Sequence, residues 1–350
     1  MLSPQVDIVI LNYNGKKFLE SCIPSLLKCT WPNTRIYVLD NASTDDDVYY
    51  VQTNFPEVQI ISNPLNNGYC AAYNLAFSAC SGKYIVCLNN DVTVNPDWIE
   101  HLVALAETDE NIAALQPKIV SYYDPNMFEY AGASGGMMDV YGFPFLRGRM
   151  FKTIEKDEGQ YNDIIDIFWA SGAAMFLRRS ALDTSGFLDE TIVHHMDEID
   201  LCWRLRMHGF RVMVQPKSVI NHIGGATIQT NSFKKVYWNH RNSIYMMLKN
   251  YGFSNLCTKV PVHIILDYVA IVQSLLTLNF TTVRGILSAH AWLLFNIPII
   301  LNKRKEVQQK RTVGDTGITP FLFRGSVVFA YFLQGKKTYK SLKITPKNGY

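Results

Sequence analysis

The stretch Tyr-Ile-Val-Cys-Leu-Asn-Asn-Asp-Val at residues 84–92 decides the fold, because an apolar run ends there abruptly in a lone carboxylate, Asp91. A run of this length with Ile, Val and Leu is typical of a buried strand. Strands of an α/β sheet deliver their last residues to the ligand crevice. A carboxylate in that place is suited to bind a divalent cation, which can in turn bind a diphosphate. A plain polar turn is the alternative, since Asn and Asp are common turn residues, and this stretch alone does not separate the two.

The residues before this strand alternate between two kinds of segment. Apolar runs predict strands over 6–11, 35–39 and 58–62, and helical spacing predicts helices over 16–29, 48–55 and 68–80. Alternation of this kind favours an α/β fold with a parallel sheet and right-handed crossovers. The loops that follow the strands should therefore gather at one edge of the sheet.

Those loops share one composition. Asn, Asp and Gly dominate residues 12–15, 40–45, 63–69 and 89–91, and these residue types supply tight turns, helix caps and short hydrogen-bonding side chains. Four such loops predict a site for a polar small molecule. The first strand is followed by no Gly-x-Gly-x-x-Gly, and the chain has no Gly-Lys-Ser/Thr, which argues against dinucleotide-binding and P-loop proteins.

The middle of the chain allows two interpretations. Residues 132–149 carry glycines, aromatic residues, Arg147 and Arg149, which suits either a flexible loop that shapes a pocket or an irregular surface loop with solvated arginines. The segment 169–177 begins with small residues, which would let a substrate approach the backbone closely.

A second acidic cluster lies at Asp197, Glu198 and Asp200, where the spacing of apolar residues predicts the opening turn of a helix. Acids there favour the helix dipole without any catalytic role. Three carboxylates within four positions repel one another, however, so we expect one of them to be a general base. Asp200 and Arg204 stand four residues apart, as in a structural ion pair.

His222 follows a short predicted strand and precedes Gly224 and Gly225. A lone histidine is more often structural than a ligand. The two glycines and the two acidic clusters favour a metal or phosphate role here.

These residues together form a recognisable set. The chain resembles the family 2 inverting glycosyltransferases with the GT-A fold, particularly the bacterial rhamnosyltransferase-like group that builds surface polysaccharides. The resemblance covers roughly residues 5–250 and rests on the motifs at 6–15, 38–45, 66–74, 88–92, 197–204 and 222–225. It implies a Rossmann-like mixed, mostly parallel sheet flanked by helices. It also implies a catalytic domain at 1–228, with a nucleotide-binding half at about 1–92 and an acceptor half at about 93–228.

The resemblance further implies roles for single residues. Asp91 corresponds to the retained acid of the family's Asp-x-Asp metal motif, and His222 to a position that helps bind the metal or diphosphate; the cofactor would be Mg²⁺ or Mn²⁺. Glu198 is the expected base and Asp197 the second choice, with the acid types swapped relative to the family's Glu-Asp pair. The residues expected to bind a UDP-, dTDP- or GDP-linked sugar are Leu11, Asn12, Tyr13, Asp40, Asn66, Gly68, Asn89 and Asn90.

Charge divides the chain. Residues 1–228 contain 16 Lys and Arg against 27 Asp and Glu, whereas residues 229–350 contain 17 against 3. The basic region also holds two apolar stretches within 261–301, the first with a narrow polar stripe that includes His263 and Asp267. Neither reaches the ~20 clean apolar residues of a membrane span, so we expect helices in the interface of an anionic membrane. A helical appendage buried against the catalytic domain, or against a second subunit in a homodimer, is the alternative.

Location and partners follow from these features. The chain starts without a basic and apolar leader, and its seven cysteines lack metal-type spacing, which favours a reduced cytoplasmic protein on the inner face of the plasma membrane. We expect a glycan or lipid-linked acceptor and no nucleic acid. The competing function is a sugar-nucleotide-binding or scaffold protein that has lost catalysis.

Overall fold

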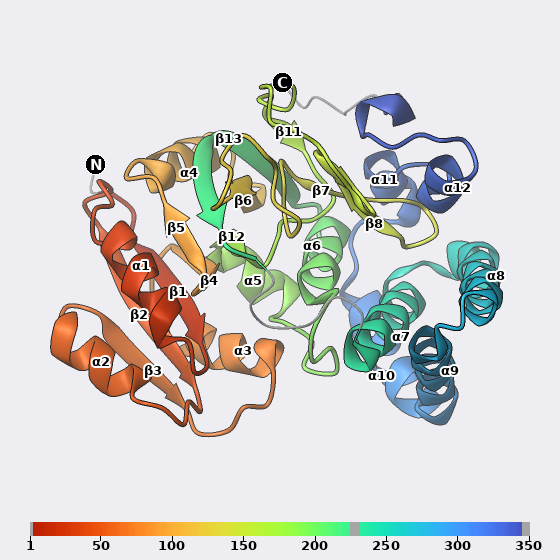
Figure 1. Cartoon of the computed structure of the whole chain (residues 1–350), viewed down its shortest axis with the longest axis horizontal. Helices are drawn as coiled ribbons and strands as arrows, with labels where there is room; N and C mark the ends of the chain where they lie inside the picture. Colours follow the sequence, from red (N-terminus) through yellow and green to blue (C-terminus); the bar gives the residue numbers. More distant parts are fainter. Residues whose placement is uncertain (1–2, 225–231, 345–350) are drawn as a thin grey trace.

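The computed structural model describes residues 3–224 and 232–344; Gly225 of the predicted motif lies outside them. Within these residues nine strands form a central sheet in the order β11-β13-β6-β12-β4-β1-β2-β3, with β5 paired to β13 (Figure 1). Its strands are β1 (Val6–Asn12), β2 (Thr34–Asn41), β3 (Gln59–Asn63), β4 (Tyr84–Asn89), β5 (Val92–Val94), β6 (Ile112–Ser121), β11 (Ile165–Asp166), β12 (Ala174–Arg178) and β13 (Arg211–His222). The flanking helices are α1 (Lys16–Leu26), α2 (Asp47–Asn54), α3 (Tyr69–Ala79), α4 (Trp98–Ala106), α5 (Arg179–Ser185) and α6 (Asp197–Met207).

The first ninety residues form the predicted parallel unit. Strands β3, β2, β1 and β4 are parallel neighbours, and helices α1 to α3 connect them, so these seven expected elements are confirmed. Strand β4 ends at Asn89, two residues earlier than expected, and Asp91 lies in the turn before β5.

The second half of the sheet is mixed. Strand β12 runs antiparallel to both β4 and β6, while β6 and β13 are parallel. The short strand expected before His222 is wrong in length, because β13 spans twelve residues and ends at His222. A register irregularity between Gln215 and Val219, beside the exposed Lys217, interrupts the apolar pattern and hides the first part of the strand from a sequence reading.

Apolar cores cover both faces of the sheet. Helices α1, α2 and α4 pack against Ile8, Ile10 and their neighbours on one face. Helices α3, α5 and α6 pack on the opposite face, together with a smaller sheet. Val9 points to this second core, so successive β1 side chains alternate between the two cores, as a strand buried on both faces requires.

The expected irregular loop at 132–149 is instead part of a small antiparallel sheet. Its strands are β7 (Gly136–Met138), β8 (Pro144–Leu146), β9 (Arg149–Met150) and β10 (Thr153–Ile154). Gly148 makes the β8–β9 turn at φ +116°, a conformation that other residues rarely adopt. The interpretation of solvated arginines is wrong for Arg147, which is buried and donates to Asp163.

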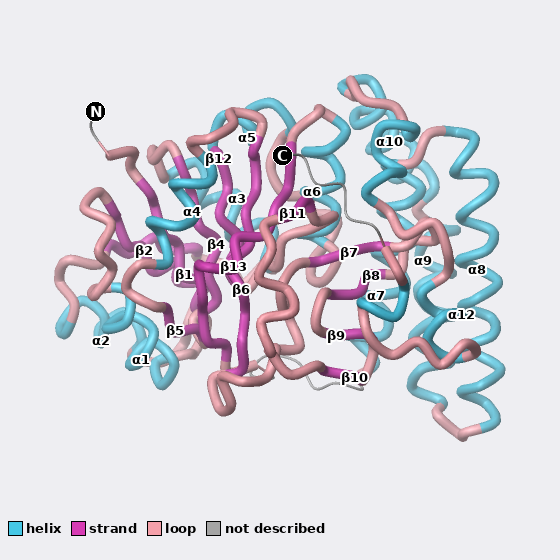
Figure 2. Tube along the Cα trace, turned by 90° about the horizontal axis from the view of Figure 1, so that it is seen from above, coloured by secondary structure: helices cyan, strands magenta, loops and turns pink. Residues whose placement is uncertain are grey.

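Helices occupy the end of the molecule away from β3, as Figures 1 and 2 both show. They are α7 (Phe233–Asn250), α8 (Phe253–Leu276), α9 (Phe280–Phe295), α10 (Ile297–Lys310), α11 (Asp315–Ile318) and α12 (Val327–Phe332), with short 3₁₀ turns at Thr319–Phe321 and Lys340–Leu342. Among the described residues, α8 is long and apolar enough to cross a membrane, and α9 with α10 would qualify only as a pair bent by 73°. We expected neither apolar stretch to be long enough to span a membrane, and for α8 that expectation is wrong.

Helix α8 buries its polar face and exposes its apolar face, the opposite of an ordinary surface helix. Its polar stripe is buried, with Asp267 accepting hydrogen bonds from His240 on α7 (2.7 Å) and His290 on α9 (2.8 Å). Its apolar face is exposed, with Val272 57% and Leu276 82% accessible. A surface helix usually buries its apolar face. In α8 the polar face is buried instead, because it packs against α7 and α9, and the apolar face is left exposed to solvent.

Candidate active site

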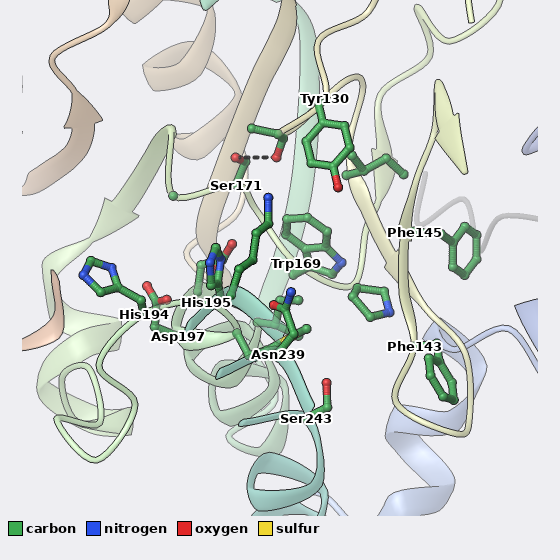
Figure 3. A pocket seen from close by; sticks show the side chains of 18 of the residues that line it. Tyr130, Phe143, Phe145, Trp169, Ser171, His194, His195, Asp197, Asn239 and Ser243 are labelled. Carbon is green, nitrogen blue, oxygen red and sulfur yellow. Dashed lines mark hydrogen bonds between the residues drawn. The ribbon is translucent and has the colours of Figure 1, made fainter. Parts of the chain in front are cut away.

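The loops at the carboxyl edge of the parallel strands border one large cavity of about 1820 Å³. Figure 3 shows part of its wall, with Asp197, His194 and His195 on one side and Phe143 and Phe145 on the other. Nine of the residues predicted from the sequence line it: Leu11, Tyr13, Asn66, Asn89, Asn90, Asp91, Asp197, Glu198 and His222. The two acidic clusters, remote in the sequence, thus face a common space.

Three further predicted residues stand behind the wall. The Asn12 side chain is buried, where it donates to Asp47 (2.6 Å) and accepts from Asn90 (2.8 Å). Asp40 accepts from the Ser43 backbone N–H at 3.0 Å. These contacts hold the loops that carry the lining residues in place.

Gly68 also supports the site from behind. It begins α3 at φ +100°, and a Cβ atom there would lie 2.9 Å from Val193 Cγ1. Only glycine combines this backbone conformation with so close a neighbour. The contact sets the loop before α6 against the start of α3.

A buried ion pair lies at the inner end of the cavity. His222 Nε2 is 3.1 Å from Asp91 Oδ1, and His222 Nδ1 is 2.9 Å from Glu129 Oε2. Burial alone lowers the pKa of His222, but the two carboxylates outweigh burial and raise that pKa to about 10. The His222 ring thus lies between two carboxylates, which favour its protonated form.

This arrangement fits a divalent cation. Asp91 and His222 bring a carboxylate oxygen and an imidazole nitrogen together, and Glu129 lies beside the other ring nitrogen, Nδ1, without forming a hydrogen bond of good geometry to it. Within residues 3–224 and 232–344, no three His, Cys, Asp or Glu side chains form a complete metal cage. Mg²⁺ and Mn²⁺ sites built from few protein ligands take their other ligands from phosphates and water, so the incomplete set suits a site shared with a diphosphate.

The second acidic pair begins helix α6. Its backbone is set by His195 and Met196, which both adopt left-handed conformations, at φ 64° and 67°. Asn242 on α7 donates to the His194 and His195 carbonyls at 2.7 and 2.9 Å and so secures this costly turn.

The two carboxyl groups of the pair have different environments. Burial raises the pKa of Asp197 well above its ordinary value, and the neighbouring Glu198 raises it further. Burial also raises the pKa of Glu198, but a hydrogen bond with Asp197 works in the opposite direction. The pKa of Asp197 is therefore raised more strongly than that of Glu198, so Glu198 is the acid of the pair that ionises more readily.

The backbone at Gly172 packs closely against residues beside this pair. A Cβ atom on Gly172 would lie 2.9 Å from Tyr69 Oη and 4.0 Å from Glu198 Cβ. Ser171, Gly172 and Ala173 all line the cavity, which agrees with the small residues noted at the start of this segment. Asp200, by contrast, is fully buried and pairs with Arg204 at 2.9 Å, so its predicted structural role is confirmed.

Several lining residues escaped the sequence reading. Asn41 belongs to the Asn- and Asp-rich loop at 40–45 but was not singled out. Its side chain accepts a hydrogen bond from Asn63 at 2.7 Å and donates one to Asn66 at 2.9 Å. Glu129 is an isolated acid without any motif, so no signal distinguished it. Arg149 and Lys235 likewise lacked a pattern, although the loop that holds Arg149 was noted as a candidate pocket wall.

Comparison with known proteins adds an independent finding. The model of the family described as "Glycosyl transferase family 2" matches residues 7–186, just over half of the chain. The O-antigen biosynthesis protein RfbC of Myxococcus xanthus is 25% identical over 248 residues, 67% of this chain and 19% of that protein. The N-acetylglucosaminyl-diphospho-decaprenol L-rhamnosyltransferase of Mycobacterium tuberculosis is 26% identical over 235 residues, 62% of this chain and 75% of that enzyme.

A solved structure supports the fold. The mannosyltransferase PcManGT from Pyrobaculum calidifontis, solved with GDP-Man and Mn²⁺, has a TM-score of 0.52 at 13% identity, and the match covers 95% of this chain and 88% of that one. Such low identity bears on architecture only. The expected GT-A arrangement of a central sheet flanked by helices, with a helical C-terminal extension, is confirmed. The length shared with curated relatives varies widely, and the chain spans only about a fifth of the Myxococcus protein.

Proposed function

The chain belongs to glycosyl transferase family 2, and from this membership we propose that it transfers a sugar from a nucleotide-sugar donor to a hydroxyl group of a glycan or lipid-linked acceptor. Cell-surface polysaccharide synthesis is the proposed setting, because the similar proteins include an O-antigen biosynthesis protein and a rhamnosyltransferase that uses a lipid diphosphate. One observation carries the proposal: the Asp91–His222 pair and the Asp197–Glu198 pair line the same cavity.

Donor binding is proposed at the carboxyl edge of β1, β2 and β4. Leu11, Tyr13 and Asn66 would contact the nucleotide, and Asn89 and Asn90 the sugar diphosphate. Asp91 and His222 would hold Mg²⁺ or Mn²⁺, as the metal-bound mannosyltransferase suggests. Such a cation would neutralise the negative charge that develops on the departing diphosphate.

The proposed chemistry uses Glu198 as the base. Its carboxylate takes the proton from the acceptor hydroxyl as that oxygen attacks the anomeric carbon. The bond from that carbon to the diphosphate breaks in the same step, and its electron pair leaves with the nucleoside diphosphate. A single displacement inverts the anomeric configuration. Asp197 keeps its own proton and hydrogen-bonds the base.

We also propose that the protein works at the inner face of the plasma membrane. The exposed apolar face of α8 and the basic composition of residues 229–350 both suit an anionic lipid surface. Helices that lie on the surface, rather than cross it, keep the cavity open to cytoplasmic nucleotide sugars.

Substitution at Glu198 tests the function. In the Glu198→Gln variant, we expect donor binding to stay near the wild-type value and turnover to fall by about 10²–10⁴-fold, because the amide cannot accept the proton. Hydrolysis and transfer would be measured with a panel of UDP-, dTDP- and GDP-sugars, with and without Mn²⁺. Transfer at the wild-type rate by Glu198→Gln would remove the base assignment. Wild-type protein that binds a nucleotide sugar but never turns it over would favour the non-catalytic alternative.

A further inference from the structure

The cavity is larger than one nucleotide sugar needs, and its far part differs in chemistry. Ligand pockets usually measure about 300–1,000 Å³, whereas this one measures about 1820 Å³. Besides the two pairs that contain Asp91 and Glu198, the wall includes basic and apolar residues. The basic part is supplied by Arg149 of β9 and Lys235 of α7, and the apolar part by Leu266, Val269, Val328, Phe329, Phe332 and Leu333.

Arg149 forms no ion pair with a carboxylate among the described residues, although Glu129 is near enough to favour its charge. Its guanidinium lies 3.6 Å from the centre of the Tyr130 ring, and Nη1 donates to the Tyr130 carbonyl at 2.5 Å. Its Nε is buried without a hydrogen-bond acceptor. The guanidinium is partly buried on the cavity wall, and the one carboxylate that favours its charge, Glu129, is itself 2.9 Å from His222, so Arg149 keeps donors for an anionic ligand.

Lys235 faces the same ring. Its ammonium lies 5.4 Å from the centre of Tyr130, and no carboxylate in residues 3–224 or 232–344 forms an ion pair with it. The two cations therefore flank one aromatic ring on the cavity wall. Such a pair matches the charge and the several oxygens of a diphosphate.

The apolar part of the wall adjoins this cationic pair. Phe151, two residues after Arg149, packs against Phe332 of α12 with ring centres 5.0 Å apart. Val269, Phe329 and Phe332 line the cavity and yet remain at least half exposed. Val269 also belongs to the exposed face of α8, so the groove leads outward to the surface that we assign to the membrane.

We propose that Arg149 and Lys235 bind the diphosphate of a lipid-linked acceptor, and that the groove between α8 and α12 holds the first part of its hydrocarbon chain. This inference rests on the proposed transferase function and names its acceptor class. The acceptor sugar would extend from the diphosphate toward Glu198, while the donor occupies the Asp91 end. Charge complementarity together with the adjoining apolar wall selects this occupant, because a plain acyl chain would leave the two cations unpaired and a free diphosphate would leave the apolar wall uncovered.

Binding of farnesyl diphosphate to the full-length protein tests the proposal. The titration is made in EDTA, so that no cation at Asp91 and His222 can recruit the probe, and is repeated with farnesol and with inorganic diphosphate. We expect farnesyl diphosphate to bind more tightly than either fragment. Arg149→Ala and Lys235→Ala should each weaken it about 10-fold or more, as loss of a charge-assisted contact implies. Lys234→Ala, which removes the same charge from the exposed neighbouring residue, should leave binding unchanged.

The groove has its own test. Val269→Asp and Phe332→Asp should weaken farnesyl diphosphate binding and leave that of inorganic diphosphate as it was. Equal affinity of the wild type for farnesyl and inorganic diphosphate would contradict the role of the groove in binding the hydrocarbon chain. If neither compound binds, the whole proposal is wrong.

A donor titration separates the two possible sources of the diphosphate. UDP, dTDP or GDP, whichever binds the wild type with Mn²⁺, should bind Lys235→Ala and Arg149→Ala unchanged. Weakened nucleotide binding with normal farnesyl diphosphate binding would assign the cations to the donor and overturn the proposal. If farnesyl diphosphate behaves as expected but no nucleotide sugar is ever used, the lipid site stands and the transferase function fails.

Discussion

At the scale of single residues, burial separates two neighbouring carboxyl groups into different states. Asp197 and Glu198 are adjacent in the chain, yet the pKa of Asp197 rises further, because burial and the nearby Glu198 charge act together. Burial raises the pKa of Glu198 as well, but hydrogen bonds from the backbone and the interaction with Asp197 offset part of that rise. A base needs a free lone pair, so the difference between the two pKa shifts supports the proposal of Glu198, rather than Asp197, as the base.

The pH dependence of turnover tests this division. Only ionised Glu198 accepts a proton, and its pKa is raised by burial, so kcat/KM should fall as the pH decreases through a value above the ordinary glutamate range near ~4.3. Asp197→Ala removes the hydrogen bond that lowers this pKa, so its acidic limb should move to higher pH. Asp197→Asn retains a donor and should keep the limb near its wild-type position. Identical profiles for the two variants would contradict this division.

At the scale of elements, helix α7 connects the basic C-terminal region to helix α6, which carries Asp197 and Glu198. Asn242 holds the left-handed turn at 194–196, and Lys249 and Asn250 each contact Asp200 at 2.9 Å. These contacts fix α6 from the side opposite its sheet. The division of the chain at residue 228 stays a prediction, but α7 contributes directly to the geometry of the site.

Removal of the Asn242 amide tests this connection. Asn242→Ala leaves the His194 and His195 carbonyls without their donor, which should lower the free energy of unfolding by about 1–3 kcal/mol. Turnover should fall as well, because the turn that aims Asp197 and Glu198 is no longer secured. Urea unfolding and steady-state kinetics would measure the two effects. Asn54→Ala, which loses one local bond on α2, is the control, and equal behaviour of both variants would argue against a positioning role.

At the scale of the whole molecule, charge and apolar surface are segregated. Residues 1–228 are acidic and residues 229–350 basic, and the exposed apolar face of α8 lies on the basic part. Figures 1 and 2 place α8 at the end of the molecule away from α2. In the proposed orientation, the end that carries α8 would face the lipid surface, and strands β1 and β2 would lie at a distance from it.

Flotation with liposomes tests this orientation. The wild type should float with anionic vesicles and less with neutral ones, and added salt should reduce the binding because it screens the basic region. The double change Val272→Asp and Leu276→Asp should abolish flotation without loss of folding, since both side chains are exposed. Tyr49→Asp places a charge at a similarly exposed position on α2 and should float as the wild type does. Normal flotation of the double variant would refute α8 as the contact surface.

The sequence alone determined the parallel half of the sheet and the residues of both acidic clusters. Alternating apolar runs and helical spacing are local signals, and the Asn- and Asp-rich loops follow strands whose ends must meet. For the same reason Asp91 could be placed at the sheet edge without coordinates, whereas Glu198 was named through the resemblance to the glycosyltransferase family, and the roles of both remain predictions. The small sheet at 136–154 and the full length of β13 were missed, because two- and three-residue strands and an irregular register leave no regular period.

Only the tertiary structure decided what surrounds each charge. Glu129 meets His222, and Tyr130 lies between Arg149 and Lys235, through contacts between segments far apart in the chain. The polar stripe of α8 was visible in the sequence, but its direction was not, because periodicity shows that a helix has two faces and not which one its neighbours cover. Desolvation and charge pairing depend on three-dimensional proximity, so the raised pKa of Asp197, the buried Asp267 and the exposed apolar face could be known only after folding brought their partners together.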